Sequence, residues 1–218
     1  MNQKQKKERM AAIDQALAAL YPDAVCALEY GGEPWRLLVM ARLSAQCTDA
    51  RVNIVSRELF SRFPTLSALA DAPLEEIEEI VRPCGLFRTK AQSIKEACRI
   101  VRDEFDSRVP DNMDDLLSLP GVGRKIANLL LGDVYGQGGI VADTHCIRIC
   151  GRFGMYPTDL KDPHKVERIL SELLATDRQS DFCHRIVQFG RDVCTARKPM
   201  CDNCPLRELC DFSRVSNS

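Results

Sequence analysis

The 218-residue sequence lacks several features that would indicate particular classes of protein. It has no apolar run of the ~18 residues that a membrane-spanning helix requires, and its charged start, MNQKQKKERM, has no signal-peptide stretch after it. Strand signals are nearly absent, since the only short β-branched run is IV at residues 140–141. The net charge is −1 and the pI is near 6.3, so the charge of the whole protein would not attract a polyanion. We therefore expect a cytoplasmic protein with few or no strands.

Apolar residues recur instead at the three- and four-residue spacing of amphipathic helices, in a sequence that is 45% hydrophobic. Proline and glycine breaks divide the chain into about ten helical segments. We expect an all-α fold whose apolar stripes form the core. The clearest stripes are Met10, Ile13, Leu17 and Leu20; Leu74, Ile77 and Val81; Ala91, Ile94, Cys98 and Val101; and Val166, Ile169, Leu170 and Leu173.

The sequence contains eleven cysteines, an odd number without a secretory signal, which favours reduced thiols over a disulfide framework. Cys194, Cys201, Cys204 and Cys210 lie in one short polar segment, so we expect them to bind a metal. Their spacing, C-x6-C-x2-C-x5-C, leaves both zinc and a [4Fe–4S] cluster open. We expect the other seven to be small core residues: Cys26, Cys47, Cys84, Cys98, Cys146, Cys150 and Cys183.

The motif LPGVGRK at residues 119–125 predicts a tight turn between two helices, typical of a helix–hairpin–helix. Gly121 and Gly123 allow the backbone to approach a partner closely. The first amides of the second helix, at the positive end of its dipole, suit a phosphate. The glycines alone would fit a generic turn equally well.

Two charged residues stand close to such helix starts. Lys125 ends the hairpin motif, and Asp143 lies in VADTH at residues 141–145, where it is a natural N-cap. Taken singly, a lysine early in a helix is usually solvated and an aspartate before a helix is usually only a cap. Neither residue alone indicates a function.

Together, LPGVGRK, VADTH and the four-cysteine segment resemble the endonuclease III family in order and separation, as do LSAQ at residues 43–46 and GLFRTKA at residues 85–91. The resemblance runs from about residue 11 to residue 210. It implies two helical lobes around a DNA-binding cleft. Residues 27–137 would form a barrel-like domain with the hairpin, and residues 1–26 and 138–218 a domain that binds a [4Fe–4S] cluster rather than zinc.

The resemblance also implies a bifunctional DNA glycosylase and AP lyase of base excision repair that removes oxidised pyrimidines from double-stranded DNA. Lys125 would form a Schiff base with the sugar of an extruded nucleotide, and β-elimination would then cleave the DNA 3′ to the abasic site. Asp143 would stabilise positive charge on the sugar. Gln46 and Leu86 would fill the gap in the base stack. The enzyme would be a monomer, associated with the nucleoid in a bacterium.

Further candidates for DNA contact follow from the motifs and the resemblance. The stronger ones are Gly121, Gly123, Arg124, Arg191, Arg197 and Lys198, and the weaker ones are Ser44, Lys90, Thr144, His145 and Arg148.

Two other functions compete with this interpretation. An adenine glycosylase of the same superfamily needs a carboxylate in the helix before Gln46, but that segment, LLVMARL at residues 37–43, contains none. A module that binds DNA without turnover has no need for Lys125 and Asp143 together, and a DNA-nicking assay separates it from an enzyme.

Overall fold

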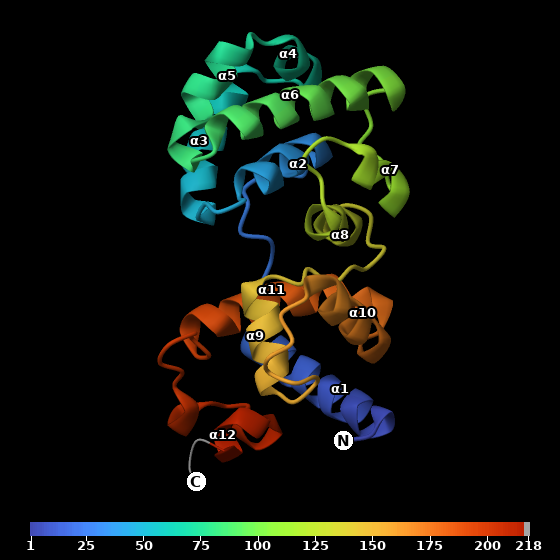
Figure 1. Ribbon diagram of the computed structural model, residues 1–218, viewed down its shortest axis with the longest axis vertical. Helices are drawn as coiled ribbons and strands as arrows, with labels where there is room; N and C mark the ends of the chain where they lie inside the picture. The colour runs from blue at the N-terminus through green and yellow to red at the C-terminus, as the bar shows by residue number, and fades with distance from the viewer. Residues whose placement is uncertain (216–218) are drawn as a thin grey trace. The chain divides into compact units, whose positions relative to one another are not determined.

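A computed structural model describes residues 1–215 of the chain (Figure 1). Within these residues the structure contains twelve α-helices, four short 3-10 helices and no β-strand, which confirms the predicted all-α class. None of the described helices is long and apolar enough to cross a membrane. The elements are α1 (Gln3–Leu20), α2 (Pro34–Leu43), α3 (Asp49–Arg62), α4 (Leu66–Asp71), α5 (Leu74–Val81), η1 (Arg82–Cys84), α6 (Phe87–Glu104), α7 (Met113–Ser118), α8 (Arg124–Asp133), α9 (Thr144–Arg152), α10 (Pro163–Leu173), η2 (Thr176–Arg178), α11 (Gln179–Asp192), η3 (Cys201–Asn203), η4 (Arg207–Leu209) and α12 (Asp211–Val215).

The chain divides into two compact units, each with its own hydrophobic core. The first, called the hairpin unit here, is Cys26–Tyr135 and contains α2 to α8. The second, called the cluster unit, combines Met1–Val25 with the chain from Gly136 onward and contains α1 and α9 to α12.

The long helix α6 organises the core of the hairpin unit. Its predicted stripe of Ala91, Ile94, Cys98 and Val101 is buried, and α6 packs against α4 and α5 (Figure 1). Helix α2 is buried on nearly all sides and contacts α3, α6 and α8. The hairpin helix α8 therefore packs against a buried apolar helix.

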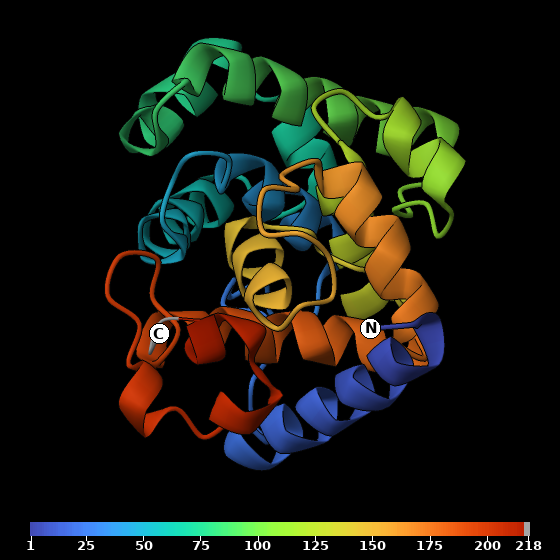
Figure 2. The same cartoon turned by 60° about the horizontal axis from the view of Figure 1, so that its bottom comes forward.

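In the cluster unit, α1 packs against α10 and α11, and α9 packs against α11 (Figure 2). Met10, Ile13 and Leu17 of α1 are buried as predicted. The prediction was wrong for Leu20, which is 42% exposed. Leu20 is the last residue of its helix, and the core contact of α1 has ended one turn earlier.

The cysteines outside the four-cysteine segment are mostly core residues, as expected. Those at 84, 98, 146, 150 and 183 are buried, whereas Cys26 and Cys47 are half-buried and pack at the edge of the core of the hairpin unit. Burial raises the pKa of the Cys98 thiol to about 12, so this group behaves as a small apolar side chain.

Candidate active site and nucleic-acid interface

The hairpin forms where the sequence predicts it, between α7 and α8. The amide of Val122 donates to the carbonyl of Leu119 at 3.1 Å and closes the turn. Gly121 has φ +78°, and a Cβ there would lie 2.4 Å from Nε of Arg42. Gly121 is therefore required both by its left-handed backbone and by its close packing against α2.

The second glycine of the hairpin has a different environment. Gly123 is the N-cap of α8, and a Cβ placed on it would meet no atom of the described residues within 4 Å. Gly121 is exposed as well, but the direction in which its Cβ would point is filled by Arg42. Gly123 is exposed and lies open for the close approach of a partner.

Lys125 is the second residue of α8, and its side chain is exposed. The first amides of an α-helix have no acceptor within the helix, and they carry the positive end of its dipole. Arg124 precedes Lys125 and is half-buried. The structure thus places an exposed amine beside backbone donors that suit an anionic partner.

Gln46 and Leu86 share an unusual backbone conformation. Gln46 has φ 54° in the loop after α2, and Leu86 has φ 48° as the N-cap of α6. Both side chains are exposed, Leu86 by 60%. A left-handed conformation in a residue other than glycine costs about 1–2 kcal/mol and often marks a functional position. The alternative for both residues, that their side chains are buried in the core, is therefore wrong.

In the cluster unit, Asp143 is the N-cap of α9, as predicted. Its Oδ1 accepts the amide of Cys146 at 2.7 Å, and its side chain is half-buried. The bond fixes one carboxylate oxygen against the start of the helix. Asp143 therefore has a structural role whatever its chemical one.

All four cysteines of the predicted metal segment line one cavity, together with apolar side chains that include Phe153, Phe189 and Phe212. Among the described residues, no group of three or more His, Cys, Asp and Glu side chains is placed to hold a single metal ion. A [4Fe–4S] cubane takes one thiolate on each of four irons, so its ligands stand farther apart than those of one zinc ion. The thiols and their apolar cavity fit the cubane.

Helix α9 also anchors this cysteine segment through Arg152, which is 9% exposed. Nη1 of Arg152 donates to Sγ of Cys194 at 3.2 Å and to the carbonyl of Thr195 at 2.8 Å, and Nη2 donates to the carbonyl of Ala196 at 3.0 Å. Burial raises the pKa of the Cys194 thiol, and the Arg152 guanidinium opposes that shift. Arg152 was not predicted from the sequence, although it lies one turn after Arg148 on the same helix.

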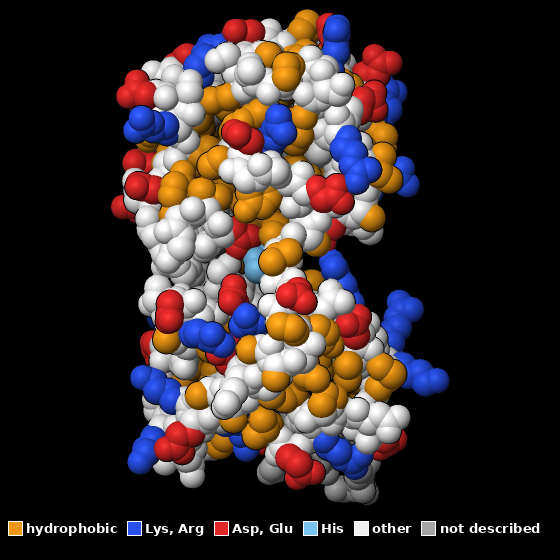
Figure 3. Space-filling model, turned by 180° about the vertical axis from the view of Figure 1, so that it is seen from behind, with side chains coloured by type: hydrophobic (Ala, Val, Ile, Leu, Met, Phe, Trp, Pro, Cys, Tyr) orange, Lys and Arg blue, Asp and Glu red, His pale blue; other side chains and the backbone are white. Residues whose placement is uncertain are grey.

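Arg197 and Lys198 directly follow the backbone that Arg152 holds, and both side chains are exposed. Arg191, in the last turn of α11, is exposed as well, and so is Thr144. On the face shown in Figure 3, basic and acidic side chains are interspersed. That face as a whole therefore offers no uniform positive charge for a polyanion.

Three other candidates are occupied by contacts within the protein. Nη2 of Arg148 donates to the carbonyl of Cys194 at 2.9 Å and lies 3.3 Å from Nδ1 of half-buried His145. The hydroxyl of Ser44 donates to the carbonyl of Ala41 at 2.8 Å. Lys90 is 0% exposed, so its inclusion as a candidate for DNA contact was wrong.

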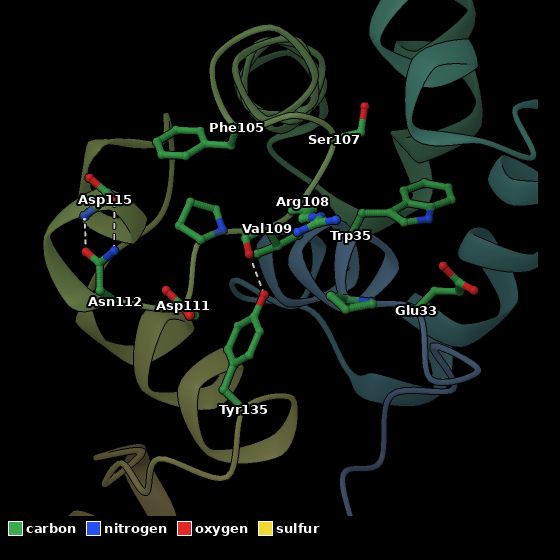
Figure 4. A pocket seen from close by; sticks show the side chains of 12 residues that line it. Glu33, Trp35, Phe105, Ser107, Arg108, Val109, Asp111, Asn112, Asp115 and Tyr135 are labelled. Atoms are coloured by element: carbon green, nitrogen blue, oxygen red, sulfur yellow. Dashed lines mark hydrogen bonds between the residues drawn. The ribbon is translucent and has the colours of Figure 1, made fainter.

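A cavity of about 510 Å³ in the hairpin unit contains none of the predicted site residues. It is lined by Trp35, Phe105 and Tyr135, whose hydroxyl donates to the carbonyl of Val109 (Figure 4). Its charged lining is three carboxylates against one cation, Arg108, and this net negative charge disfavours a phosphate backbone; the carboxylates are those of Glu33, Asp111 and Asp115. This cavity is not the predicted nucleic-acid site.

Comparison with known proteins identifies the family. Residues 39–176 match the HhH-GPD superfamily of base excision DNA repair proteins, and residues 194–210 match the iron–sulfur binding domain of endonuclease III. The second match decides between the metals in favour of a [4Fe–4S] cluster.

Individual proteins give the same result. The chain is 45% identical to endonuclease III of Synechocystis sp., over 97% of this chain and 95% of that protein. It is 37% identical to endonuclease III of Bacillus subtilis, over 88% and 86%. A solved structure of a trapped endonuclease III–DNA covalent intermediate superposes with a TM-score of 0.90 at 37% identity, covering 97% of this chain and 99% of that one. The chain therefore belongs to the endonuclease III family, within the HhH-GPD superfamily of base excision DNA repair proteins.

Proposed function

We propose that Lys125 is the nucleophile, and Asp143 its electrostatic partner, in the DNA glycosylase and AP lyase reaction that this family carries out. The observation that carries the assignment is the exposed amine of Lys125 at the start of α8, directly after the hairpin. A relative with 37% identity over nearly the whole chain has been trapped as a covalent intermediate with DNA. A covalent intermediate requires a nucleophile, and an exposed amine beside a phosphate-binding helix start meets that requirement.

In this reaction the neutral amine of Lys125 attacks C1′ of the damaged nucleotide. The glycosidic bond breaks, and the base leaves with the bonding electrons and takes up a proton. The C1′–O4′ bond then breaks, the proton that the amine gives up passes to O4′, and a protonated Schiff base remains. Loss of a C2′ proton then expels the 3′ phosphate and cleaves the strand by β-elimination.

Asp143 acts while the base departs, when positive charge grows on the sugar. Its Oδ1 is held by the amide of Cys146, so the carboxylate is already oriented and needs little reorganisation. Because the helix start fixes one oxygen, the second oxygen can face the sugar.

Gln46 and Leu86 are proposed to replace the extruded nucleotide in the stack. Extrusion costs a few kcal/mol of stacking and pairing, which an inserted side chain can partly offset. Leu86 can wedge between base steps as an exposed apolar group, and Gln46 can hydrogen-bond the widowed base.

Phosphate contacts are proposed for the amides at Gly123 and Arg124 and for the side chains of Arg191, Arg197 and Lys198. These groups hold the DNA in register and do not read its sequence. The [4Fe–4S] cluster, when bound, links the four thiolates and so fixes the loop that carries Arg197 and Lys198. Cys194 and the other three thiols hold it, and Arg152 holds the neighbouring backbone.

The proposed substrate is double-stranded DNA that contains oxidised pyrimidines or abasic sites, and the enzyme is proposed to act as a monomer at the chromosome. A duplex with one ring-saturated thymine tests the function. The wild-type protein should release the base and nick the strand, whereas Lys125→Gln should bind the duplex equally well and do neither. Binding without nicking by the wild-type protein would instead show a DNA-binding module.

A further inference from the structure

Lys90 is a buried cation with two backbone partners. It lies in the first turns of α6, and its side chain is completely inaccessible to solvent. Its Nζ donates to the carbonyl of Leu43 at 2.8 Å and to the carbonyl of Cys84 at 2.7 Å. Lysine is almost never fully buried, so this position requires a specific reason.

The two carbonyls belong to the ends of two helices. Leu43 is the last residue of α2, and Cys84 is the last residue of η1. The last carbonyls of a helix have no hydrogen-bond donor within that helix, and the Lys90 ammonium group supplies one to each of the two. Its positive charge also complements the negative end of the α2 dipole. The chain leaves α2 toward Gln46 and leaves η1 toward Leu86.

Each of the two loops that Lys90 joins contains a strained residue. Gln46 and Leu86 both have left-handed backbones, with φ 54° and 48°, and such conformations persist only when the surrounding structure enforces them. One Nζ reaches the carbonyls of both Leu43 and Cys84, so the two loops adjoin. Lys90 is thus placed to hold both loops at once.

The same turn of α6 also reaches the hairpin. The hydroxyl of Ser93 donates to the carbonyl of Lys90 at 3.0 Å and accepts Nε of Arg42 at 2.8 Å. Gly121 packs closely against that Arg42 side chain. Lys90, Ser93 and Arg42 therefore form one polar network, which joins both loops and packs against the hairpin.

We propose that Lys90 is a positioning residue for nucleotide extrusion. It fixes the spacing of the Gln46 and Leu86 loops so that both side chains enter the base stack in one concerted step. The inference rests on the proposed role of Gln46 and Leu86 as the groups that fill the stack.

Lys90→Met tests the proposal, since methionine fills a similar volume without donors. Lys95→Met is the matched control, because Lys95 lies on the same helix and donates to a single carbonyl, that of Ala72, at 2.7 Å. Extrusion is measured from the fluorescence of 2-aminopurine beside the lesion, and loop order from amide hydrogen exchange at Gln46 and Leu86.

We expect Lys90→Met to slow extrusion by about tenfold or more, the scale for losing charged hydrogen bonds to two buried carbonyls, and to speed exchange at both loops. Affinity for undamaged duplex should stay unchanged. Lys95→Met should lower stability only. If Lys90→Met does not fold, Lys90→Gln, which keeps a donor, should give a smaller change in the same direction.

The outcomes separate the two proposals. If Gln46→Ala and Leu86→Ala leave extrusion unchanged, the proposed role of these side chains fails. If they slow extrusion while a folded Lys90 variant extrudes at the wild-type rate, the positioning role is overturned. It is also overturned if Lys95→Met slows extrusion as much as Lys90→Met, because the effect would then follow from stability alone.

Discussion

Asp143 has two roles in this account, and two substitutions separate them. Asparagine keeps the side-chain oxygen that accepts the Cys146 amide at 2.7 Å and removes the charge, whereas alanine removes both. Asn and Asp are about equally good N-caps, and loss of a cap typically costs about 1 kcal/mol. In urea denaturation, the free energy of unfolding of Asp143→Asn should therefore lie within about 0.5 kcal/mol of the wild-type value. That of Asp143→Ala should be about 1 kcal/mol lower than wild type.

Base release should respond in a different way. Removing a preorganised charge that faces the transition state costs about 10²-fold or more, so both variants should slow single-turnover base release by at least that factor. Asp162 provides the control, because it caps α10 in the same unit by accepting the amides of His164 and Lys165 at 2.9 and 3.1 Å. Asp162→Ala should lower stability and leave base release unchanged. Wild-type base release by Asp143→Asn would refute the electrostatic role.

Further predictions concern the DNA-contacting residues and the cluster. The double variant Arg197→Ala with Lys198→Ala should reduce the slope of log duplex affinity against log salt concentration by up to ~2. An unchanged slope would show that this loop does not contact the DNA. Leu86→Gly and Leu86→Ala should slow base release equally, but the glycine variant should be about 1 kcal/mol more stable in urea, since glycine adopts φ 48° without strain. Equal stability would show that Leu86 is unstrained. Purified protein should contain about four iron atoms with sulfide, and Cys204→Ser should lose iron, stability and DNA affinity together; one zinc and no iron would contradict the cluster.

The features that were predictable from the sequence are local in origin. The hairpin follows from two glycines in LPGVGRK, and the cap of α9 follows from an aspartate at a helix start. The stripe of α6 follows from helical periodicity. Each depends on residues within a few positions of one another, so short-range rules suffice.

The features that were not predictable depend on contacts between distant segments. Lysine is usually a surface residue, and Lys90 becomes a buried donor only because α2, η1 and α6 meet around it. Gly121 lies against Arg42, which is far away in the sequence. Arg152 meets Cys194 only because α9 packs beside the cysteine segment. No periodicity or spacing in the sequence encodes such pairs.

The central claim is that Lys125 forms the covalent bond to DNA. Borohydride added during turnover of a damaged duplex reduces a Schiff base to a stable amine, and mass spectrometry of the digested adduct locates the modified side chain. We expect one adduct, on Lys125, and none with Lys125→Gln, although that variant should still bind the duplex. An adduct on another lysine, or wild-type cleavage of damaged DNA by Lys125→Gln, would contradict it.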